Sequence, residues 1–550
     1  MMQPKISASL KEPALAEAYS AIAYIGYPFA QTHPDRLATL GALFGLQPAP
    51  VGKCRVLELG CGDGGNLIPM AFTLPDSDFV GIDLASAPVE RGKEMIAELR
   101  LSNIELRCED IMRFHGDQQS FDYIIAHGVF SWVPQAVRLQ MLELCRKLLA
   151  PHGVAYISYN CYPGYHLRNL TREMMIFHTR AMTDPKEQVQ QGLSLLQWLL
   201  RKFPDEVTAR NDLYGALLTE QLDLLMGHRH REQIYHDDLA AENTPFYFYQ
   251  FNALAEQHGL QYLGEADYFE MQDFIYPEPI REVLGQFGDE RVVIKEQYLD
   301  FLKCRTFRQT LLCHEDAPVR RRIDPALMTK FYFESQARPV SAQPDLRAGV
   351  VEEFHGPRGA KLQTDFPPAK AALLALGDEW PRYLSWGEMR QAASARLGID
   401  GTLEVASQLD DESRTLSEIL LAACGSDLIR LHARPPQFVT KVSERPVASP
   451  LARAQANHGG VVTSMSHKSV DIEDSLSVKL LQLLDGARDH AALCDEMMNF
   501  IARGAAFTRP DGTPINDQQE ARSVVTTAIE ANLRKLAQMA LLVANGKEPS

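Results

Sequence analysis

Three glycines stand at alternate positions in the segment VLELGCGDGG, residues 56–65. Gly60, Gly62 and Gly64 follow a short apolar run and precede a segment with helical character. A turn of this kind needs glycine because the backbone must bend sharply and approach a ligand closely, and the following helix offers free N–H groups. We therefore expect this turn to hold part of a bound small molecule.

Acidic residues follow the next two predicted strands. The run FVGIDL ends near Asp83, whose carboxylate can accept hydrogen bonds from both ribose hydroxyls of a nucleoside. The run IELRCED ends in Glu109 and Asp110, which we expect to meet an adenine amine, with Ile111 as an apolar wall. Because the carboxyl ends of parallel strands meet at one edge of a sheet, these groups should converge with the glycine turn.

The elements that must position these groups alternate between strand and helix. Between Cys54 and Asn160, apolar runs of strand length are separated by amphipathic segments, and the runs are RVLELG, FVGIDL, IELRCED, YIIAHGV and GVAYISYN. This alternation is typical of a parallel sheet covered by helices on both faces. The sequence therefore predicts an α/β fold with a doubly wound, Rossmann-like sheet.

The spacing E-x-G-x-G-x-G, from Glu58 to Gly64, resembles that of class I S-adenosylmethionine-dependent methyltransferases and differs from the G-x-G-x-x-G of dinucleotide sites. The resemblance implies S-adenosylmethionine as the cofactor. It implies that the glycines line the methionine moiety, Asp83 holds the ribose, Asp110 and Ile111 hold the adenine, and His127 lies near the sulfonium. The implied cofactor-binding set is Glu58, Gly60, Gly62, Gly64, Asp83, Leu84, Asp110, Ile111 and His127.

Other segments resemble a narrower group, the methyltransferases that carry a methyltransferase regulatory domain. They are YIGYPFAQTHPDRLATLGALFGL, IYHDDLAAENTPFYFYQFNALAEQHGLQYLGEA and QYLDFLKCRTFRQTLLCHE, the last ending at Glu315. That group includes the rickettsial protein lysine methyltransferases, which have a cofactor domain, a helical dimerisation element, a middle domain and a C-terminal domain. The resemblance implies a protein acceptor, with lysine favoured, and a homodimer formed through a helical insertion.

Aromatic residues follow the fourth and fifth predicted strands, at the edge where a methyl group would be transferred. An amine could bind between such rings through cation–π contacts, and Ser158, Asn160 and His166 add polar groups. The alternative is that the rings pack the insertion against the sheet. The aromatic set is Phe130, Trp132, Tyr159, Tyr162 and Tyr165.

From this set and its neighbours we predict four catalytic residues, His127, Trp132, Tyr159 and Asn160. A sulfonium already activates its methyl group, so alignment of the acceptor and exclusion of water should suffice. A lysine acceptor, with a reference pKa near 10.4, must first lose a proton, which burial among aromatic rings favours. Replacing Trp132 or Tyr159 by alanine should reduce turnover while nearly preserving cofactor affinity.

The chain is too long for one core, so we predict several domains. Five segments are expected: a methyltransferase core with an N-terminal lid (1–163), a helical insertion (164–245), a completion of the sheet (246–315), a middle α+β winged-helix-like domain (316–440) and a mainly helical C-terminal domain (441–550). The alternative for the third segment is a separate small domain.

The later segments are expected to combine short strands with helices. Strands should occupy 329–364, with a hairpin turn between Gly356 and Gly359, and residues 435–470 should form a loop rich in proline and serine. The candidate recognition helix of the middle winged-helix-like domain, Asp410 to Gly425, is acidic and would repel phosphate. We therefore expect these modules to contact proteins.

Charge and cysteine usage limit the partners further. The 550 residues carry a net charge of −16, from 55 lysine and arginine against 71 aspartate and glutamate residues, which disfavours nucleic acid. The nine cysteines contain no C-x-x-C pair, and neither a signal peptide nor an apolar stretch of membrane-spanning length is visible. We expect a cytoplasmic protein of bacterial type that does not bind a membrane.

Several residues admit two interpretations. His33 could lie over the cofactor or cap the following helix, and Cys61 is expected to be a small buried filler. One histidine group near the end of the insertion lacks strong metal-ligand spacing, so no metal is expected; it comprises His228, His230, His236 and Asp237.

A protein methyltransferase acting on lysine or another side-chain nitrogen is the leading hypothesis. The enzymatic alternative is a small-molecule methyltransferase, although such an acceptor would not require the long region beyond the cofactor unit. A non-catalytic alternative is a regulatory protein that binds S-adenosylmethionine as a sensor and uses its C-terminal domains to bind a partner.

Overall fold

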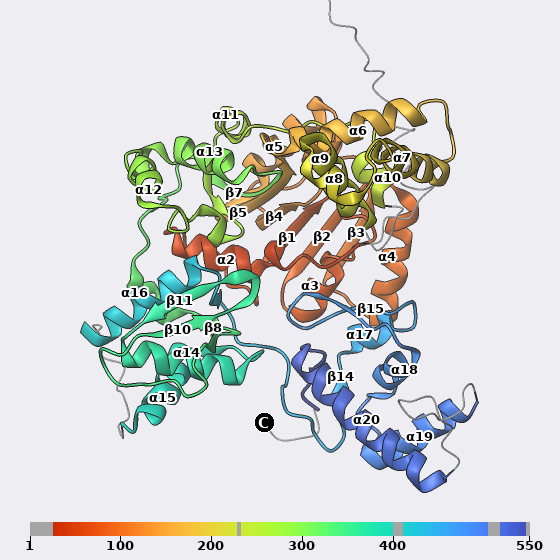
Figure 1. Ribbon diagram of the computed structural model, residues 1–550, viewed down its shortest axis with the longest axis vertical. Helices are drawn as coiled ribbons and strands as arrows, with labels where there is room; N and C mark the ends of the chain where they lie inside the picture. The colour runs from red at the N-terminus through yellow and green to blue at the C-terminus, as the bar shows by residue number, and fades with distance from the viewer. Residues whose placement is uncertain (1–25, 228–232, 400–410, 504–516, 546–550) are drawn as a thin grey trace, which may run out of the picture.

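A seven-stranded sheet lies at the centre of the computed structural model, which describes residues 26–227, 233–399, 411–503 and 517–545 (Figure 1). The strand order is β3-β2-β1-β4-β5-β7-β6. The strands are β1 (Arg55–Leu59), β2 (Asp78–Asp83), β3 (Ile104–Cys108), β4 (Phe121–Ala126), β5 (Leu149–Asn160), β6 (Leu260–Glu265) and β7 (Phe307–His314). The predicted Rossmann-like α/β fold is confirmed.

Strands β1 to β5 pair in parallel, whereas β7 pairs antiparallel with both β5 and β6. The last two strands therefore extend the same sheet, although residues 161–259 separate β6 from β5 in the sequence. The alternative of a separate small domain at 246–315 is wrong, because β7 is hydrogen-bonded along the edge of β5.

Helices cover both faces, as the apolar strand sequences require. Val56 points to the face covered by α2 (Pro34–Leu43), α3 (Leu67–Thr73) and α4 (Ser86–Leu99). The next residue, Leu57, points to the opposite face, covered by α5 (Gln135–Leu148) and α11 (Phe248–Gln257). This alternation follows from the two-residue period of a strand.

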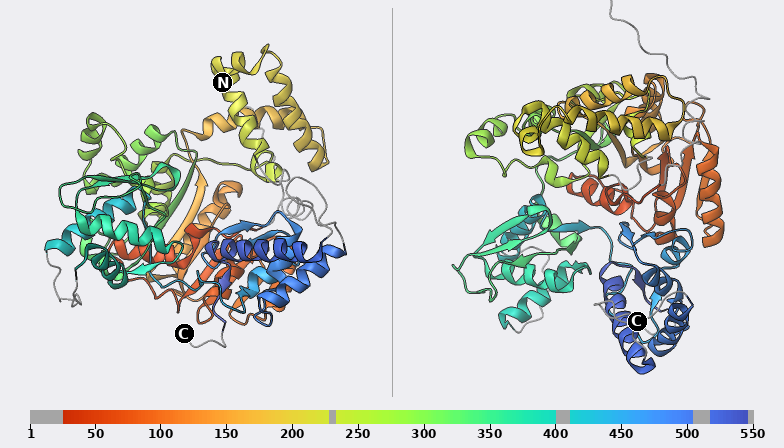
Figure 2. Two further views of the ribbon diagram at one scale, coloured as in Figure 1. Left: turned by 60° about the horizontal axis from the view of Figure 1, so that its bottom comes forward. Right: turned by 45° about the vertical axis from the view of Figure 1, so that its right-hand side comes forward.

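Among the described residues, five helices form an insertion between β5 and α11, and Figures 1 and 2 show them projecting from the sheet as a separate layer. They share a small apolar core that includes Met175, Leu196 and Leu218. The two longest, Tyr165–Thr179 and Pro185–Leu200, are amphipathic and turn an apolar side to this core. The helices are α6 (Tyr165–Thr179), α7 (Pro185–Leu200), α8 (Glu206–Asn211), α9 (Leu213–Met226) and α10 (Gln233–Asp238).

A connecting region leads back into the sheet through η3 (Tyr268–Met271), α12 (Glu278–Gly285), η4 (Asp289–Arg291) and α13 (Val292–Lys303). A middle domain follows β7 and combines two three-stranded sheets with three helices. The predicted hairpin is present, because β10 and β11 pair antiparallel around Gly356 to Gly359. The middle elements among the described residues are η5 (Pro325–Lys330), β8 (Tyr332–Glu334), β9 (Arg338–Pro339), β10 (Glu352–His355), η6 (Pro357–Gly359), β11 (Lys361–Thr364), α14 (Pro367–Glu379), β12 (Leu384–Ser385), α15 (Trp386–Leu397), α16 (Asp411–Gly425) and β13 (Arg430–His432).

The C-terminal domain has its own apolar core and lies below α3 and α4 in Figure 1. The prediction of a loop over 435–470 is wrong, since this segment contains two short strand pairings and a helix. Strands of two or three residues show no detectable alternation. The elements are β14 (Val447–Ala448), α17 (Pro450–Gln455), β15 (Val461–Thr463), β16 (Ser469–Asp471), α18 (Ser475–Leu483), α19 (His490–Ala502), α20 (Gln518–Gln538) and β17 (Leu542–Val543).

In the described part of the chain, none of the helices has the length and apolar character needed to cross a bilayer. Within the same residues, no group of three histidine, cysteine or acidic side chains is arranged to hold a metal ion. His228 and His230 lie outside the described residues, and His236 is buried in α10.

Candidate active site

The glycine-rich turn between β1 and α3 has the geometry that the sequence predicts. Gly60, Gly62 and Gly64 have positive φ angles of 75°, 56° and 74°, a region that glycine adopts without steric cost. A Cβ atom on Gly60 would lie 2.4 Å from Val129 Cγ2, whereas one on Gly62 would meet nothing within 4 Å. Gly62 therefore leaves bare backbone open to a ligand.

Asp83 ends β2 directly beside this turn. Its Oδ2 accepts a hydrogen bond from the backbone N–H of Gly62 at 2.9 Å, and its Oδ1 accepts one from Ala85 at 2.8 Å. Burial raises the pKa of Asp83, although the two backbone N–H groups act in the opposite direction. The bonds fix the carboxylate and leave further lone pairs for the ribose hydroxyls of a nucleoside.

Leu84, Asp110 and Ile111 lie at the same edge of the sheet. Asp110 Oδ1 accepts a hydrogen bond from the backbone N–H of Met112 at 2.9 Å. Leu84 is exposed, whereas Ile111 packs partly into the core beneath β4 and α5. These residues flank the end of β3, and their contacts with an adenine ring stay a prediction.

Glu58, the first residue of the motif, is buried beneath the turn. Its Oε1 accepts a hydrogen bond from Asn66 Nδ2 at 2.7 Å, but its Oε2 has no hydrogen-bond partner among the described residues. Burial raises the pKa of Glu58 to about 8, against the effect of the bond from Asn66. A buried polar atom without a partner is costly. The site therefore fits S-adenosylmethionine, whose methionine part carries an ammonium group.

The segment before α2 lies across the turn as a lid. The backbone N–H of Gly26 donates to Asp63 Oδ2 at 3.3 Å, and that of Phe29 donates to Asn66 Oδ1 at 2.9 Å. A Cβ atom on Gly65 would lie 2.4 Å from the Gly26 carbonyl carbon, so the two segments touch without intervening side chains. The lid and the turn therefore form one continuous wall of the site.

His33 caps α2, because its Nδ1 accepts a hydrogen bond from the backbone N–H of Asp35 at 3.1 Å. Burial lowers the pKa of His33 to about 4. The structure therefore contains the helix cap, which is one of the two interpretations of His33. Cys61 is buried beside Gly62, and burial raises the pKa of its thiol well above the usual value, as expected for an inert filler.

His127 follows β4 and lies between the lid and β5. Its Nδ1 shares a hydrogen bond with the hydroxyl of Tyr156 at 2.9 Å, and its ring centroid is 3.8 Å from that of Phe29. Burial lowers the pKa of His127 to about 4. The imidazole is therefore uncharged near neutral pH and adds no repulsion toward a cationic sulfonium.

The structure separates the predicted aromatic rim into two groups. Phe130 and Tyr159 are buried in the core, where the Tyr159 ring stacks on Phe251 at 4.0 Å and its hydroxyl contacts Thr310. Tyr165 is also buried, and its hydroxyl accepts a hydrogen bond from Asn243. These rings pack the helical insertion and α11 against β5. This packing is the alternative interpretation of the aromatic set.

Trp132 and Tyr162 stay nearer the surface. Trp132 is half-buried at the end of the short turn after β4, and Tyr162 stacks on His166 with ring centroids 4.0 Å apart. Asn160 is buried and its Nδ2 donates to Asn243 Oδ1 at 3.0 Å, while Ser158 accepts a hydrogen bond from the backbone N–H of Gly128. The catalytic roles of Trp132, Tyr159 and Asn160 stay predictions.

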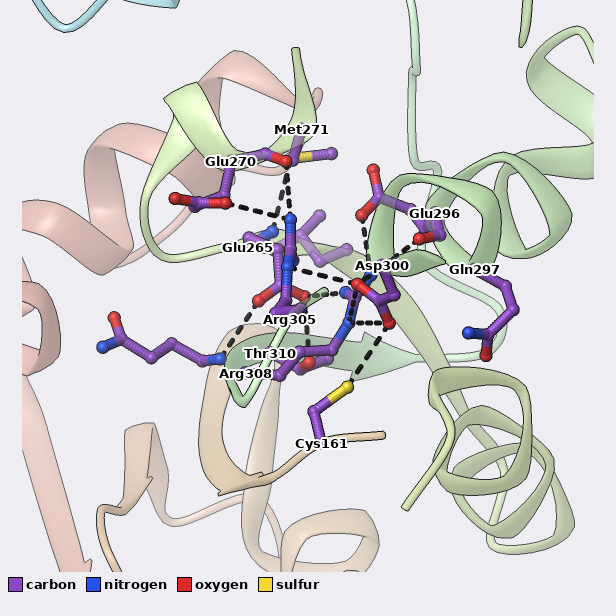
Figure 3. Close-up of polar contacts among 12 residues, drawn as sticks. Cys161, Glu265, Glu270, Met271, Glu296, Gln297, Asp300, Arg305, Arg308 and Thr310 are labelled. Carbon is purple, nitrogen blue, oxygen red and sulfur yellow. Dashed lines mark hydrogen bonds and ion pairs between the residues drawn. The ribbon is translucent and has the colours of Figure 1, made fainter. Parts of the chain in front are cut away.

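A buried charge cluster fixes the neighbouring edge of the sheet (Figure 3). The guanidinium of Arg308, on β7, bonds to the carboxylates of Glu265, Glu296 and Asp300. Glu265 also accepts from Thr310 Oγ1 at 2.9 Å. Buried charges require such pairing, and the network ties β6, β7 and α13 together beside the site.

Sequence reasoning missed four residues that contact the candidate site, namely Phe29, Asp63, Asn66 and Tyr156. The one available signal was Asn66, a polar residue at the start of a helix that follows the glycine turn. The other contacts join segments far apart in the chain, so local patterns could not reveal them.

Comparisons with known proteins agree with this geometry. Family models match residues 56–153 as a methyltransferase domain, 230–314 as a predicted methyltransferase regulatory domain and 444–541 as the PKMT C-terminal winged helix domain. The fold and the site define a class I S-adenosylmethionine-dependent methyltransferase.

Two relatives extend the likeness along the chain. Protein RP789 of Rickettsia prowazekii is 30% identical over 532 residues, which cover 96% of this chain and 93% of that protein. The structure of PKMT2 from Rickettsia typhi in complex with AdoHcy has a TM-score of 0.82 and 28% identity, covering 95% of this chain and 100% of that one. The chain therefore belongs to the family of these rickettsial proteins, with a methyltransferase core, a regulatory domain and a C-terminal winged helix domain.

Proposed function

We propose that this methyltransferase methylates nitrogen atoms of protein side chains, with lysine as the favoured acceptor. The observation that carries the proposal is the likeness to PKMT2 over 95% of the chain, which includes the middle and C-terminal domains as well as the cofactor unit. A small acceptor would need only the unit around the sheet. Extra domains with separate surfaces suit recognition of a macromolecule.

S-adenosylmethionine supplies an activated methyl group when bound, so the residues of the chain mainly orient the acceptor and exclude water. The lid, held by Asp63 and Asn66, closes one side of the site. His127, uncharged and paired with Tyr156, lines the next side. Both features would shield a bound cationic donor from water without adding positive charge.

A cavity of about 510 Å³ opens next to Phe307, on the side of β6 and β7. The Phe307 ring centroid lies 6.1 Å from that of His127, so the cavity adjoins the candidate site. Asp267, Phe269 and Glu270 contribute carboxylates and an aromatic face to its lining. We propose this cavity as the entry for the acceptor side chain, because it adjoins His127 and offers the carboxylate of Asp267 and the aromatic face of Phe269. Lys303 and Arg305 also line it, and both are paired with Glu270.

Exposed apolar side chains on the insertion support the proposal of a homodimer. Phe177, Trp198, Leu213 and Leu224 are 66%, 63%, 91% and 59% exposed. Apolar side chains so exposed suggest a surface that another protein covers. A Leu213→Lys variant should shift the molar mass measured by light scattering from dimer to monomer, whereas an unchanged mass would contradict the role of this face.

We also propose that the protein acts in the bacterial cytoplasm and does not bind nucleic acid. The bacterial origin of its rickettsial relatives and its free cysteines support the location. The net charge of −16 and the acidic start of α16 support the exclusion of nucleic acid.

The test is incubation of the purified protein with tritiated S-adenosylmethionine and cell lysate, followed by fractionation and amino-acid analysis. Label in methyllysine of protein supports the proposal. Label in extractable metabolites would indicate a small-molecule methyltransferase, and binding of the cofactor without transfer would indicate a regulatory protein.

The variant Asp83→Ala should abolish labelling, because it removes the carboxylate at the ribose position. Asp78→Ala is the matched control, since Asp78 is an exposed residue at the opposite end of the same strand. Equal loss in both variants would contradict the assignment of Asp83.

A further inference from the structure

A β-hairpin of the C-terminal domain packs against the methyltransferase domain. Strands β15 and β16 pair antiparallel, and His467 lies in the turn between them with a positive φ of 56°. His467 is only 4% exposed, although it belongs to a turn at the edge of its own domain. Figure 1 shows β15 next to the lower end of the sheet domain, in agreement with this burial.

The imidazole of His467 reaches the cofactor motif through one intermediate residue. Its Nε2 lies 3.0 Å from Asn66 Oδ1, and Asn66 Nδ2 donates to Glu58 Oε1 at 2.7 Å. Glu58 is the acidic residue that begins the glycine motif. A side chain of the last domain therefore lies two hydrogen bonds away from the buried carboxylate that begins the glycine motif.

The direction of these bonds is fixed by the lid. The backbone N–H of Phe29 can only donate, so the Asn66 atom that it contacts at 2.9 Å must be the amide oxygen. His467 must then donate its Nε2–H to the same oxygen, and the amide nitrogen of Asn66 must face Glu58. The hydroxyl of Thr32 also lies within 3.2 Å of that oxygen.

Asn66 is thus a junction of the lid, the glycine motif and the C-terminal hairpin. We propose that His467 is a positioning residue for the cofactor site, which locks Asn66 so that Glu58 Oε2 stays aimed at the ammonium group of S-adenosylmethionine. The C-terminal winged helix domain thereby supports the cofactor site through the contact of His467 with Asn66, in addition to any contact with the acceptor. This role does not depend on which acceptor is methylated.

His467 also faces His33, with ring centroids 5.0 Å apart. His467 Nδ1 has no hydrogen-bond partner among the described residues. Burial and the neighbouring His33 lower the pKa of His467 well below its usual value, so the ring is neutral and a single N–H is available. That N–H donates to Asn66 Oδ1, so this hydrogen bond uses the one donor that the neutral His467 ring has.

The test compares His467→Gln with His467→Met in the full-length protein. Glutamine keeps an N–H donor at the end of the side chain, whereas methionine has a similar length and no donor. Both side chains carry a similar cost at a positive φ, so backbone strain cancels in the comparison. Calorimetric titration with S-adenosylhomocysteine should give a Kd about tenfold higher for H467M than for H467Q, as expected for one lost hydrogen bond.

Kinetics with S-adenosylmethionine provide a second readout. The KM for the cofactor should rise about tenfold in H467M while kcat changes less than twofold. A merely structural role would lower the amount of active protein and therefore kcat, and leave KM unchanged.

His458→Ala is the matched control, because His458 also joins the C-terminal domain to the core, through an exposed contact of 3.0 Å with Glu98 on α4. This variant should bind S-adenosylhomocysteine as the unaltered protein does. Equal Kd values for H467M and H467Q would overturn the proposal, and so would an equal weakening by H458A.

Discussion

The middle domain and the C-terminal domain are attached to the methyltransferase sheet in different ways. Buried residues of the middle domain, such as Phe333 and Leu376, belong to the same continuous apolar cluster as Val56 of β1. The C-terminal domain has a separate cluster that includes Leu480 and Leu533. Its contacts with the sheet domain include the polar side-chain pairs of His467 and His458.

This difference indicates two kinds of domain contact. A shared apolar core makes the middle domain part of the folding unit of the sheet, because burial of continuous apolar surface is the main stabilising term. Polar contacts between separate cores allow a domain to detach locally without unfolding the rest. Four substitutions test this distinction, and they are ordered by the expected loss in free energy of unfolding.

The largest effect is expected for Phe333→Ala in the shared core. Phe333 is fully buried on β8 between Leu384 and Leu431, and loss of such a ring costs about 4 kcal/mol. Because the core is continuous, urea unfolding followed by circular dichroism should shift the transition of the whole sheet domain. Phe500→Ala, at a 36% exposed position, is the control and should change stability by less than about 1 kcal/mol.

Leu480→Ala in the separate core should cost about 3 kcal/mol, within the range for buried leucines. Leu480 is 1% exposed on α18. The loss should appear as an earlier transition of the C-terminal domain alone, with the main transition unmoved and with weaker binding of S-adenosylhomocysteine once that domain has melted. A single transition that shifts as a whole would show that the two cores unfold together.

His432→Gln should cost about 2 kcal/mol, because it removes the partner of two buried carboxylates. His432 contacts Asp35 of α2 at 2.7 Å and Glu334 of β8 at 3.3 Å. Burial alone would lower the pKa of His432, but these two carboxylates raise it above 6.5. The same contacts lower the pKa values of Asp35 and Glu334, against their own burial.

The sign of the pH dependence follows from these directions. Stability from His432 is present below its unfolded pKa of about 6.5 and is lost as the pH rises through the higher folded value. Stability from Asp35 and Glu334 is present above their unfolded values and is lost as the pH falls. Urea unfolding between pH 6 and 9 should therefore show a steeper decline for the unaltered protein than for H432Q, and equal slopes would contradict the assignment.

The smallest effect is expected for His458→Ala, which removes an exposed contact between the C-terminal domain and α4. Both side chains are largely exposed, at 62% for His458 and 39% for Glu98, and such pairs contribute less than about 0.5 kcal/mol. Thermal unfolding at low and high salt should give nearly the same midpoint for the variant and the unaltered protein. A large destabilisation would mean that this polar contact holds the domains together.

The local sequence predicts the sheet well, because its strands are buried on both faces and its helices are amphipathic. Gly60, Gly62 and Asp83 occupy the positions that the motif predicts, since a sharp turn and a strand end are local properties. The hairpin at Gly356 to Gly359 is predictable for the same reason.

The parts that could not be predicted depend on distant contacts. The strands β15 and β16 are three residues each, too short for a periodic signal. His467 contacts Asn66 across 401 positions of the sequence, and no local pattern encodes such a pair. Tyr159, near the end of β5, is predicted to belong to a catalytic rim, but its burial against Phe251 depends on α11, which lies far along the chain.

The order of the strands has a consequence for synthesis of the chain. The edge of β5 that pairs with β7 stays unpaired until residues 161–306 have been made. At elongation rates of about 5–20 residues per second, this interval lasts on the order of ten seconds. During that time the growing chain exposes an unpaired row of β5 backbone N–H and C=O groups, which is a template for pairing with another strand.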